Sequence, residues 1–213
     1  MNFHGAAQHR PNMFPDTKTE IAHAAAALIV EEGMESGPAK KHALKQLGLR
    51  ANTPLPDNQL IEEAVREYIA IFKAEEQPIE LQALRQIAQH WMLQLADFKP
   101  LVGGAVWSGT ATRHSNIHLQ LFCDDSKALP IVLLNQGLHF EVEEATGISG
   151  ISTEVLVLEE RTKHPQLEAT VLICLWNNSE AALRGALQAD ADGRPPRGAL
   201  PALQARMAEY AAP

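Results

Sequence analysis

The sequence is poor in several features that would point to a particular class of protein. Its 213 residues include only two cysteines, Cys123 and Cys174, and each lies inside an apolar run. Reduced, buried thiols fit these positions better than a disulfide framework or a zinc cluster. No stretch approaches the apolar length that spans a bilayer, and the first ten residues have no apolar segment behind a basic one. We therefore expect a cytoplasmic protein without a membrane partner.

Basic residues are also few. Lys and Arg total 18 against 26 Asp and Glu, which gives a formal net charge of -8. Affinity for nucleic acid rests largely on cationic side chains that neutralise phosphates. The composition therefore argues against nucleic acid as a partner, although a local basic patch remains open.

The first part of the chain has a helical period. Residues 1–18 contain Gly, Pro, Asn and His without a period, and we expect a flexible arm there. Apolar residues then recur at three-to-four spacing in four segments, which begin near Thr19, Pro38, Asp57 and Pro78. Asp57 is placed to cap the third segment, which continues to Phe72. Four amphipathic helices with short turns predict a helical bundle over residues 19–97.

Short β-rich runs follow residue 97. They are expected at residues 101–106, 117–123, 139–144, 154–159 and 167–175. One helix interrupts them, with Asp124, Asp125 or Ser126 as its cap and Gly137 after its end. The pattern predicts an α+β chain with a sheet over residues 98–176. A C-terminal extension over residues 177–213 is expected to end in a short helix at residues 201–210.

Residues 101–122 carry the most informative motif. Gly104-Ala105 forms a turn, Gly109-Thr110-Ala111 lies in a loop, and Ser115-Asn116-Ile117-His118-Leu119 opens the next strand. The motif resembles the signature of the nucleotidyltransferase superfamily, in which a Gly-Ser turn precedes a Gly-Thr-Ala loop and a strand reading Ser-Asp-Ile-Asp-Leu. This resemblance implies a nucleotidyltransferase-like mixed sheet with flanking helices behind the N-terminal helical bundle.

Three stretches of the helical part share a second pattern. They read Leu28-Ile29-x-Glu31-Glu32-Gly33, then Ala39-Lys40-Lys41, then Leu55-Pro56-x-Asn58-x-x-Ile61-Glu62. This pattern is similar to an uncharacterised proteobacterial family of nucleotidyltransferase-like proteins, some of which are labelled UDP-N-acetylmuramate–alanine ligases. The sequence does not support that label, because it has no Gly-x-x-Gly-Lys-Thr phosphate loop and is too short for a three-domain ligase.

The resemblance implies that Asn116 and His118 stand where two aspartates would hold magnesium. Nucleotidyl transfer uses two magnesium ions to stabilise the attacking and leaving oxygens, and alternate residues of one strand face the same side. Neither replacement brings negative charge, and imidazole suits transition metals better than magnesium. Only Glu168 and Glu154 are expected on strands from which a carboxylate could reach the site.

The predicted site therefore has two parts. Its degenerate catalytic positions are Asn116, His118 and Glu168. Its contacts to a nucleotide or a phosphorylated small molecule are expected from the turn, the loop and the start of the strand, at Gly103, Gly104, Ala105, Gly109, Thr110 and Ser115. The sequence favours a ligand-binding pseudoenzyme.

Two alternatives remain open. An active nucleotidyltransferase with a variant metal site would use magnesium, which is not expected otherwise. An interaction module without ligand would form a homodimer.

Several histidines and tryptophans give weaker signals. His114, His118 and His139 fit surface or hydrogen-bonded histidines better than a transition-metal site. Trp91, on a helical stripe, is expected in the core. Trp107 is expected in the loop beside the site, where an exposed aromatic ring could stack on a base.

Overall fold

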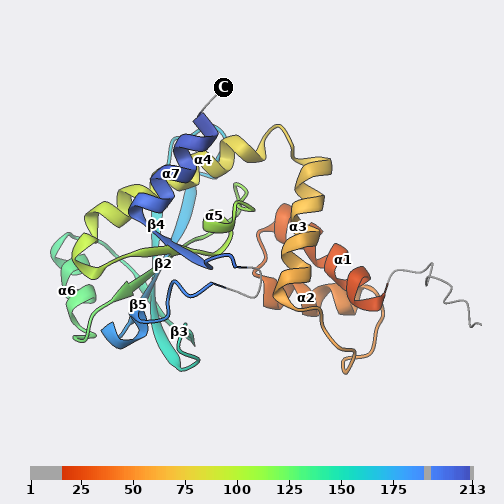
Figure 1. Ribbon diagram of the computed structural model, residues 1–213, viewed down its shortest axis with the longest axis horizontal. Coiled ribbons are helices and arrows are strands. Elements are labelled where there is room, and N and C mark those ends of the chain that lie inside the picture. The colour runs from red at the N-terminus through yellow and green to blue at the C-terminus, as the bar shows by residue number, and fades with distance from the viewer. Residues whose placement is uncertain (1–15, 190–192, 212–213) are drawn as a thin grey trace, which may run out of the picture.

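The computed structural model describes residues 16–189 and 193–211. They form a group of helices on one side and a six-stranded mixed sheet with its own helices on the other (Figure 1). The expected α+β class, with a mixed sheet and flanking helices, is confirmed. Most of the arm predicted over residues 1–18 lies outside the described residues. Among the helices that are described, none has the length and apolar character needed to cross a membrane.

The first three helices pack around a core of their own. They are α1 (Thr17–Glu32), α2 (Ser36–Gln46) and α3 (Asn58–Phe72). Asp57 caps α3 as expected, because its Oδ1 accepts a hydrogen bond of 2.8 Å from the backbone N–H of Leu60. The buried side chains of this core are small or aliphatic, and include Ile21, Ala22, Ala25, Ala26, Val30, Ala39, Ala43, Ile61, Ala64 and Val65.

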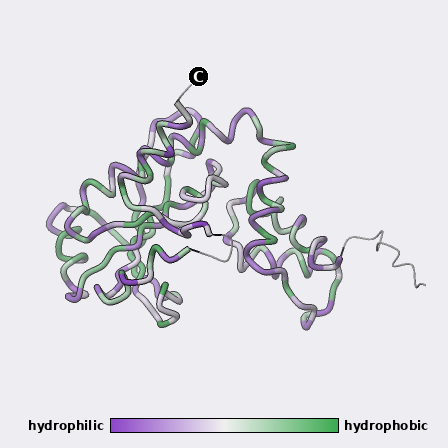
Figure 2. Tube along the Cα trace, in the orientation of Figure 1, coloured by the Kyte–Doolittle hydropathy of each residue, from purple (hydrophilic) through white to green (hydrophobic). Residues whose placement is uncertain are grey.

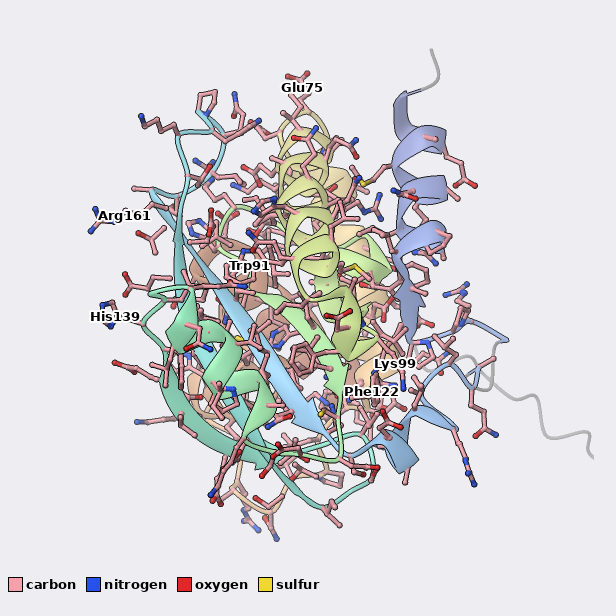
Figure 3. All side chains as sticks on the ribbon, turned by 90° about the vertical axis from the view of Figure 1, so that its left-hand side faces the viewer. Glu75, Trp91, Lys99, Phe122, His139 and Arg161 are labelled. Carbon is pink, nitrogen blue, oxygen red and sulfur yellow. The ribbon has the colours of Figure 1, made fainter. Side chains whose placement is uncertain are left out.

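The fourth helix packs differently from the expectation. α4 (Gln77–Gln94) buries Leu84, Ala88, Trp91 and Met92 in the core of the sheet, apart from the core of α1 to α3. A helical period shows that one face is apolar, but it does not show which surface that face meets. The sequence therefore predicted one bundle of four helices, whereas α1, α2 and α3 form a core of their own and α4 packs on the sheet. Trp91 lies in the interior, as expected, whereas Glu75, His139 and Arg161 lie at the periphery (Figure 3).

The sheet has the strand order β3-β4-β5-β2-β1-β6. Its strands are β1 (Leu101–Gly103), β2 (Ile117–Phe122), β3 (Glu141–Thr146), β4 (Ser152–Arg161), β5 (Thr170–Asn178) and β6 (Arg197–Ala199). β2 and β5 are parallel, and the other neighbouring pairs are antiparallel.

One face of the sheet is covered by α4, α6 (Ala128–Asn135) and α7 (Leu200–Ala211). Along β2, Ile117, Leu119 and Leu121 point into this core, so His118 and Gln120 point to the opposite face. The tube in Figure 2 shows α6 as a largely hydrophobic segment, and its Leu129 and Leu133 are fully buried.

Three local expectations are corrected by the structure. The strand expected over residues 101–106 ends at Gly103, because Gly104 has a φ of 61° and turns the chain into the short helix α5 (Gly104–Ser108). The strand expected from residue 167 begins at Thr170. A further strand, β6, was not expected from the Pro-rich segment before it.

The carboxylates expected to cap α6 have other partners. Asp125 accepts from the backbone N–H of Lys127, one residue before α6 begins. Asp124 accepts from the backbone N–H of Glu180, at the start of the 3-10 helix η2 (Glu180–Leu183). Gly137 follows the helix end as expected.

Candidate functional site

The motif residues meet on the face of the sheet opposite α4, α6 and α7. The register places Gly103 of β1 beside His118 of β2, and His118 beside Cys174 of β5. On the other side of Gly103 stands Arg197 of β6. Arg197, Gly103, His118 and Cys174 therefore form one row across four neighbouring strands.

A carboxylate from the helical part contacts both Asn116 and His118. Oε1 of Glu35 lies 3.4 Å from Nδ2 of Asn116 and 3.2 Å from Nε2 of His118. Glu35 directly precedes α2, and 83 positions separate it from His118. Nothing in the local sequence marks it as a site residue, because only the packing of the helical part against the sheet brings it here.

The other ring nitrogen of His118 also has a partner. Nε1 of Trp176, on β5, donates to Nδ1 of His118 over 3.2 Å. An indole N–H can only donate, so Nδ1 carries the lone pair and Nε2 of the neutral imidazole carries the proton. His118 therefore donates to Glu35. Trp176, His118 and Glu35 form a chain of hydrogen bonds with a defined direction.

The charges of these groups follow from their contacts. The hydrogen bond from His118 lowers the pKa of Glu35, although desolvation opposes the shift, so Glu35 is an anion at neutral pH. Its side chain is 59% exposed, which limits this contact to about 1 kcal/mol or less. Burial, with a smaller effect of Glu35, raises the pKa of Cys174 to about 12. Cys174 is therefore a thiol at neutral pH and does not fit a nucleophile.

The donor set does not fit a pair of magnesium ions. Both ring nitrogens of His118 are engaged, Asn116 is neutral, and Glu35 is the carboxylate in contact with them. Two-metal catalysis needs several anionic oxygens around the ions. Within residues 16–189 and 193–211, no three His, Cys, Asp or Glu side chains gather as a metal site.

Arg197 and His118 flank the glycine turn. A Cβ at Gly103 would lie 3.3 Å from Cγ of Arg197, and a Cβ at Gly104 would lie 3.4 Å from Cδ2 of His118. Nη1 of Arg197 donates to the carbonyl of Ala186 over 3.0 Å. Burial lowers the pKa of Arg197, yet a guanidinium stays charged in proteins. The described residues show Arg197 in no ion pair.

The remaining predicted ligand contacts lie in the loop between α5 and β2. The carbonyls of Gly109 and Ala111 accept from Nε2 of Gln77, at 3.1 and 2.8 Å. Thr110 is 8% exposed, and its hydroxyl lies 2.9 Å from that of Ser108. The hydroxyl of Ser115 accepts from the backbone of Thr112. These contacts join the loop to α4 and to itself, and the contact of these residues with a ligand stays a prediction.

The two glutamates considered as replacement ligands have other neighbours. Glu168 precedes β5 instead of lying on it, and its Oε1 is 3.3 Å from Nδ1 of His114. Glu154 is exposed on β4, between Glu144 and Asn177 of the adjacent strands. The carboxylate that contacts Asn116 and His118 is instead Glu35. The third histidine considered for a metal, His139, lies at the edge of the molecule (Figure 3).

Trp107 is a structural residue, so the prediction that it stacks on a base is wrong. It lies on α5 with 4% of its surface exposed. Its Nε1 donates to the carbonyl of Pro195 over 2.7 Å, and the guanidinium of Arg206 lies 3.7 Å from the ring centroid. The helix that replaces the expected loop turns this ring toward β6 and α7.

No family model matches the chain, and no curated protein does. Two structures of Cid1 are similar. One is of Cid1 in complex with the UTP analogue UMPNPP, at 15% identity over 58% of this chain and 39% of that chain, with a TM-score of 0.33. The other describes the structural plasticity of Cid1 as a basis for its RNA terminal uridylyl transferase activity, at 16% identity, 59% and 39% coverage and a TM-score of 0.33. The chain thus spans less than half the length of the Cid1 structures.

Proposed function

We propose that this chain is a nucleotidyltransferase-like protein that binds a nucleotide or a phosphorylated small molecule and has lost two-metal catalysis. One observation carries the proposal: the hydrogen-bonded chain from Trp176 through His118 to Glu35 stands where the resemblance implies two metal-binding aspartates. Both ring nitrogens of His118 are engaged in these hydrogen bonds, so His118 is not free to ligate a metal. Glu35 is then the one carboxylate at the site.

The glycine turn supports the ligand-binding part of the proposal. Gly103 and Gly104 have no side chain of their own over the backbone, so Arg197 and His118 pack directly against the turn, and Ala105 follows without a bulky side chain. Arg197 lies against Gly103 and adds a positive charge. A guanidinium binds phosphate oxygens through charge-assisted hydrogen bonds. A chain with an overall negative charge thus has a local cation at the turn.

Titration calorimetry tests the proposal with ATP, GTP, CTP and UTP, each with and without magnesium. We expect at least one of them to bind, and Arg197→Ala to weaken that binding about tenfold or more. Arg161→Ala is the matched control, because Arg161 is an exposed arginine at the far end of β4 and its loss should change affinity less than twofold. Failure of all four nucleotides to bind would contradict the ligand-binding part, and magnesium-dependent nucleotide transfer would contradict the loss of catalysis.

An active enzyme with a variant metal site is the second candidate, and the position of Glu35 favours it. A carboxylate in contact with Asn116 and His118 is what such a site would require. Release of pyrophosphate from nucleoside triphosphates with magnesium or manganese measures this activity. If release is detected, Glu35→Gln should abolish it, and Glu168→Gln tests the residue expected from the sequence.

An interaction module is the third candidate. An interaction module needs an apolar surface, and the end of α3 has one: Ile71 and Phe72 are 70% and 61% exposed. Sedimentation at high concentration tests for a homodimer, and a strictly monomeric protein would count against it.

A further inference from the structure

We propose that Asn116 and His118 have become an anion-binding pair, which holds a phosphate oxygen of the ligand without a metal, and that the Glu35 carboxylate competes with that phosphate for the same donors. The inference rests on the proposed function, since it specifies how the same ligand is held and what regulates its binding. Where aspartates would attract cations, the chain now presents hydrogen-bond donors.

The direction of the hydrogen bonds carries the first step. The indole of Trp176 fixes Nδ1 of His118 as an acceptor, so the proton on Nε2 points at Oε1 of Glu35. The amide nitrogen of Asn116 lies 3.4 Å from the same oxygen. Two donors therefore converge on one anionic oxygen. Phosphate and carboxylate oxygens accept hydrogen bonds in the same way, so Glu35 occupies a position that suits a phosphate oxygen.

The row across the sheet indicates the class of ligand. His118 and Arg197 are two strands apart, with Gly103 between them. Adjacent strands are separated by about 4.8 Å, so the backbones at the two ends of this row are about 10 Å apart. A chain of phosphates can contact both His118 and Arg197 across the glycine turn, and it makes more charge-assisted hydrogen bonds there than a single phosphate can. The row therefore favours a diphosphate or triphosphate over a monophosphate.

A ligand can displace the Glu35 carboxylate from Asn116 and His118 at little cost. Its side chain is more than half exposed and makes no hydrogen bond that caps α2. It belongs to the short connection between α1 and α2, outside either helix. An exposed contact of this kind contributes little to stability, so a ligand with several contacts can displace it. Because the ligand must displace Glu35, its apparent affinity for the wild-type protein is lower by a fixed factor. Removal of Glu35 should raise the affinity by the same factor.

Calorimetry in EDTA with sodium tripolyphosphate as the probe tests the inference. Wild-type protein should bind tripolyphosphate without metal, and Glu35→Ala and Glu35→Gln should each bind it about fivefold more tightly. Glu32→Gln is the matched control, since it removes the same charge from an exposed residue at the end of α1 and should change affinity less than twofold. Adding His118→Phe to Glu35→Ala should abolish the gain.

The possible results separate this inference from the proposed function. If wild type binds but the Glu35 variants bind no tighter than Glu32→Gln, competition by Glu35 is refuted while ligand binding stands. If nucleoside triphosphates bind only with magnesium, the metal-free pair is refuted and ligand binding again stands. If neither tripolyphosphate nor any nucleotide binds to wild type or to Glu35→Ala, both proposals are refuted.

Discussion

Trp107→Ala is expected to remove a large part of the stability of the sheet. A tryptophan buries roughly 150–250 Å², which at about 25 cal/mol per Å² corresponds to about 4–6 kcal/mol, close to the ~3–5 kcal/mol found for such truncations. Trp107 is 4% exposed, so nearly all of this burial is lost. The hydrogen bond to Pro195 and the stacking of Arg206 overlap with the same packing, so we expect a total of about 4–5 kcal/mol.

Urea denaturation measures this loss as a shift of the midpoint at constant slope. Trp107→Phe keeps most of the ring packing and leaves the Pro195 carbonyl without its donor, so its cost should be about 1–3 kcal/mol. Nucleotide affinity, measured where both variants are folded, should change less than twofold. If Trp107→Ala loses less than about 1 kcal/mol and abolishes nucleotide binding, the ring serves the ligand and the structural assignment is wrong.

Three further predictions concern the packing of Trp107, the ion pair that α4 makes with the loop before β2, and the contact of Glu35 with His118. Gly198→Ala places a Cβ 2.0 Å from Cζ3 of Trp107 and should destabilise the fold by at least about 2 kcal/mol in urea; an unchanged midpoint would contradict that close packing. Arg113→Ala leaves the carboxylate of Glu80, which is 2% exposed, without its guanidinium partner at 3.2 Å; because the Arg113 side chain is 43% exposed and the backbone N–H of residue 113 still donates to Glu80, the cost in thermal unfolding should be about 1–2 kcal/mol, and no measurable cost would show that the pair is not coupled to folding. The pKa of Glu35 is lowered from 4.5, so its contribution to stability is present above that value and lost as the pH falls through the folded-state pKa. The free energy of unfolding of wild type should therefore exceed that of Glu35→Gln by up to about 1 kcal/mol at pH 7 and by less near pH 3. A difference that grows as the pH falls would contradict the shift.

The fold was largely predictable because its signals are local. Asp57 and the apolar face that follows it specify a capped helix within a few residues, and the structure has that cap. The order of strands and helices follows in the same way from alternation and periodicity. The partner of α4 was not predictable, since an amphipathic helix fits a bundle or a sheet equally well.

The site was predictable only where it lies in one stretch of chain. The motif positions Gly103 and His118 pair on neighbouring strands, and Gly104 follows at the start of α5 beside His118. Glu35 and Arg197 come from segments far from them in sequence and have no motif of their own. Trp107 was expected in a loop for a related reason: the positive φ of Gly104 begins a short helix where the sequence indicated the end of a strand and then a loop.

The central claim is that a phosphate-bearing ligand binds beside His118 without a metal. The chain has three tryptophans, so its indole N–H groups give three resolved probes in a ¹H–¹⁵N spectrum, assigned by single Phe variants. On addition of a nucleoside triphosphate in EDTA, we expect the Trp176 resonance to shift, because its N–H bonds to His118, while those of the buried Trp91 and Trp107 stay in place. A Trp176 resonance that does not move at saturating ligand, or a shift confined to Trp107, would contradict the account.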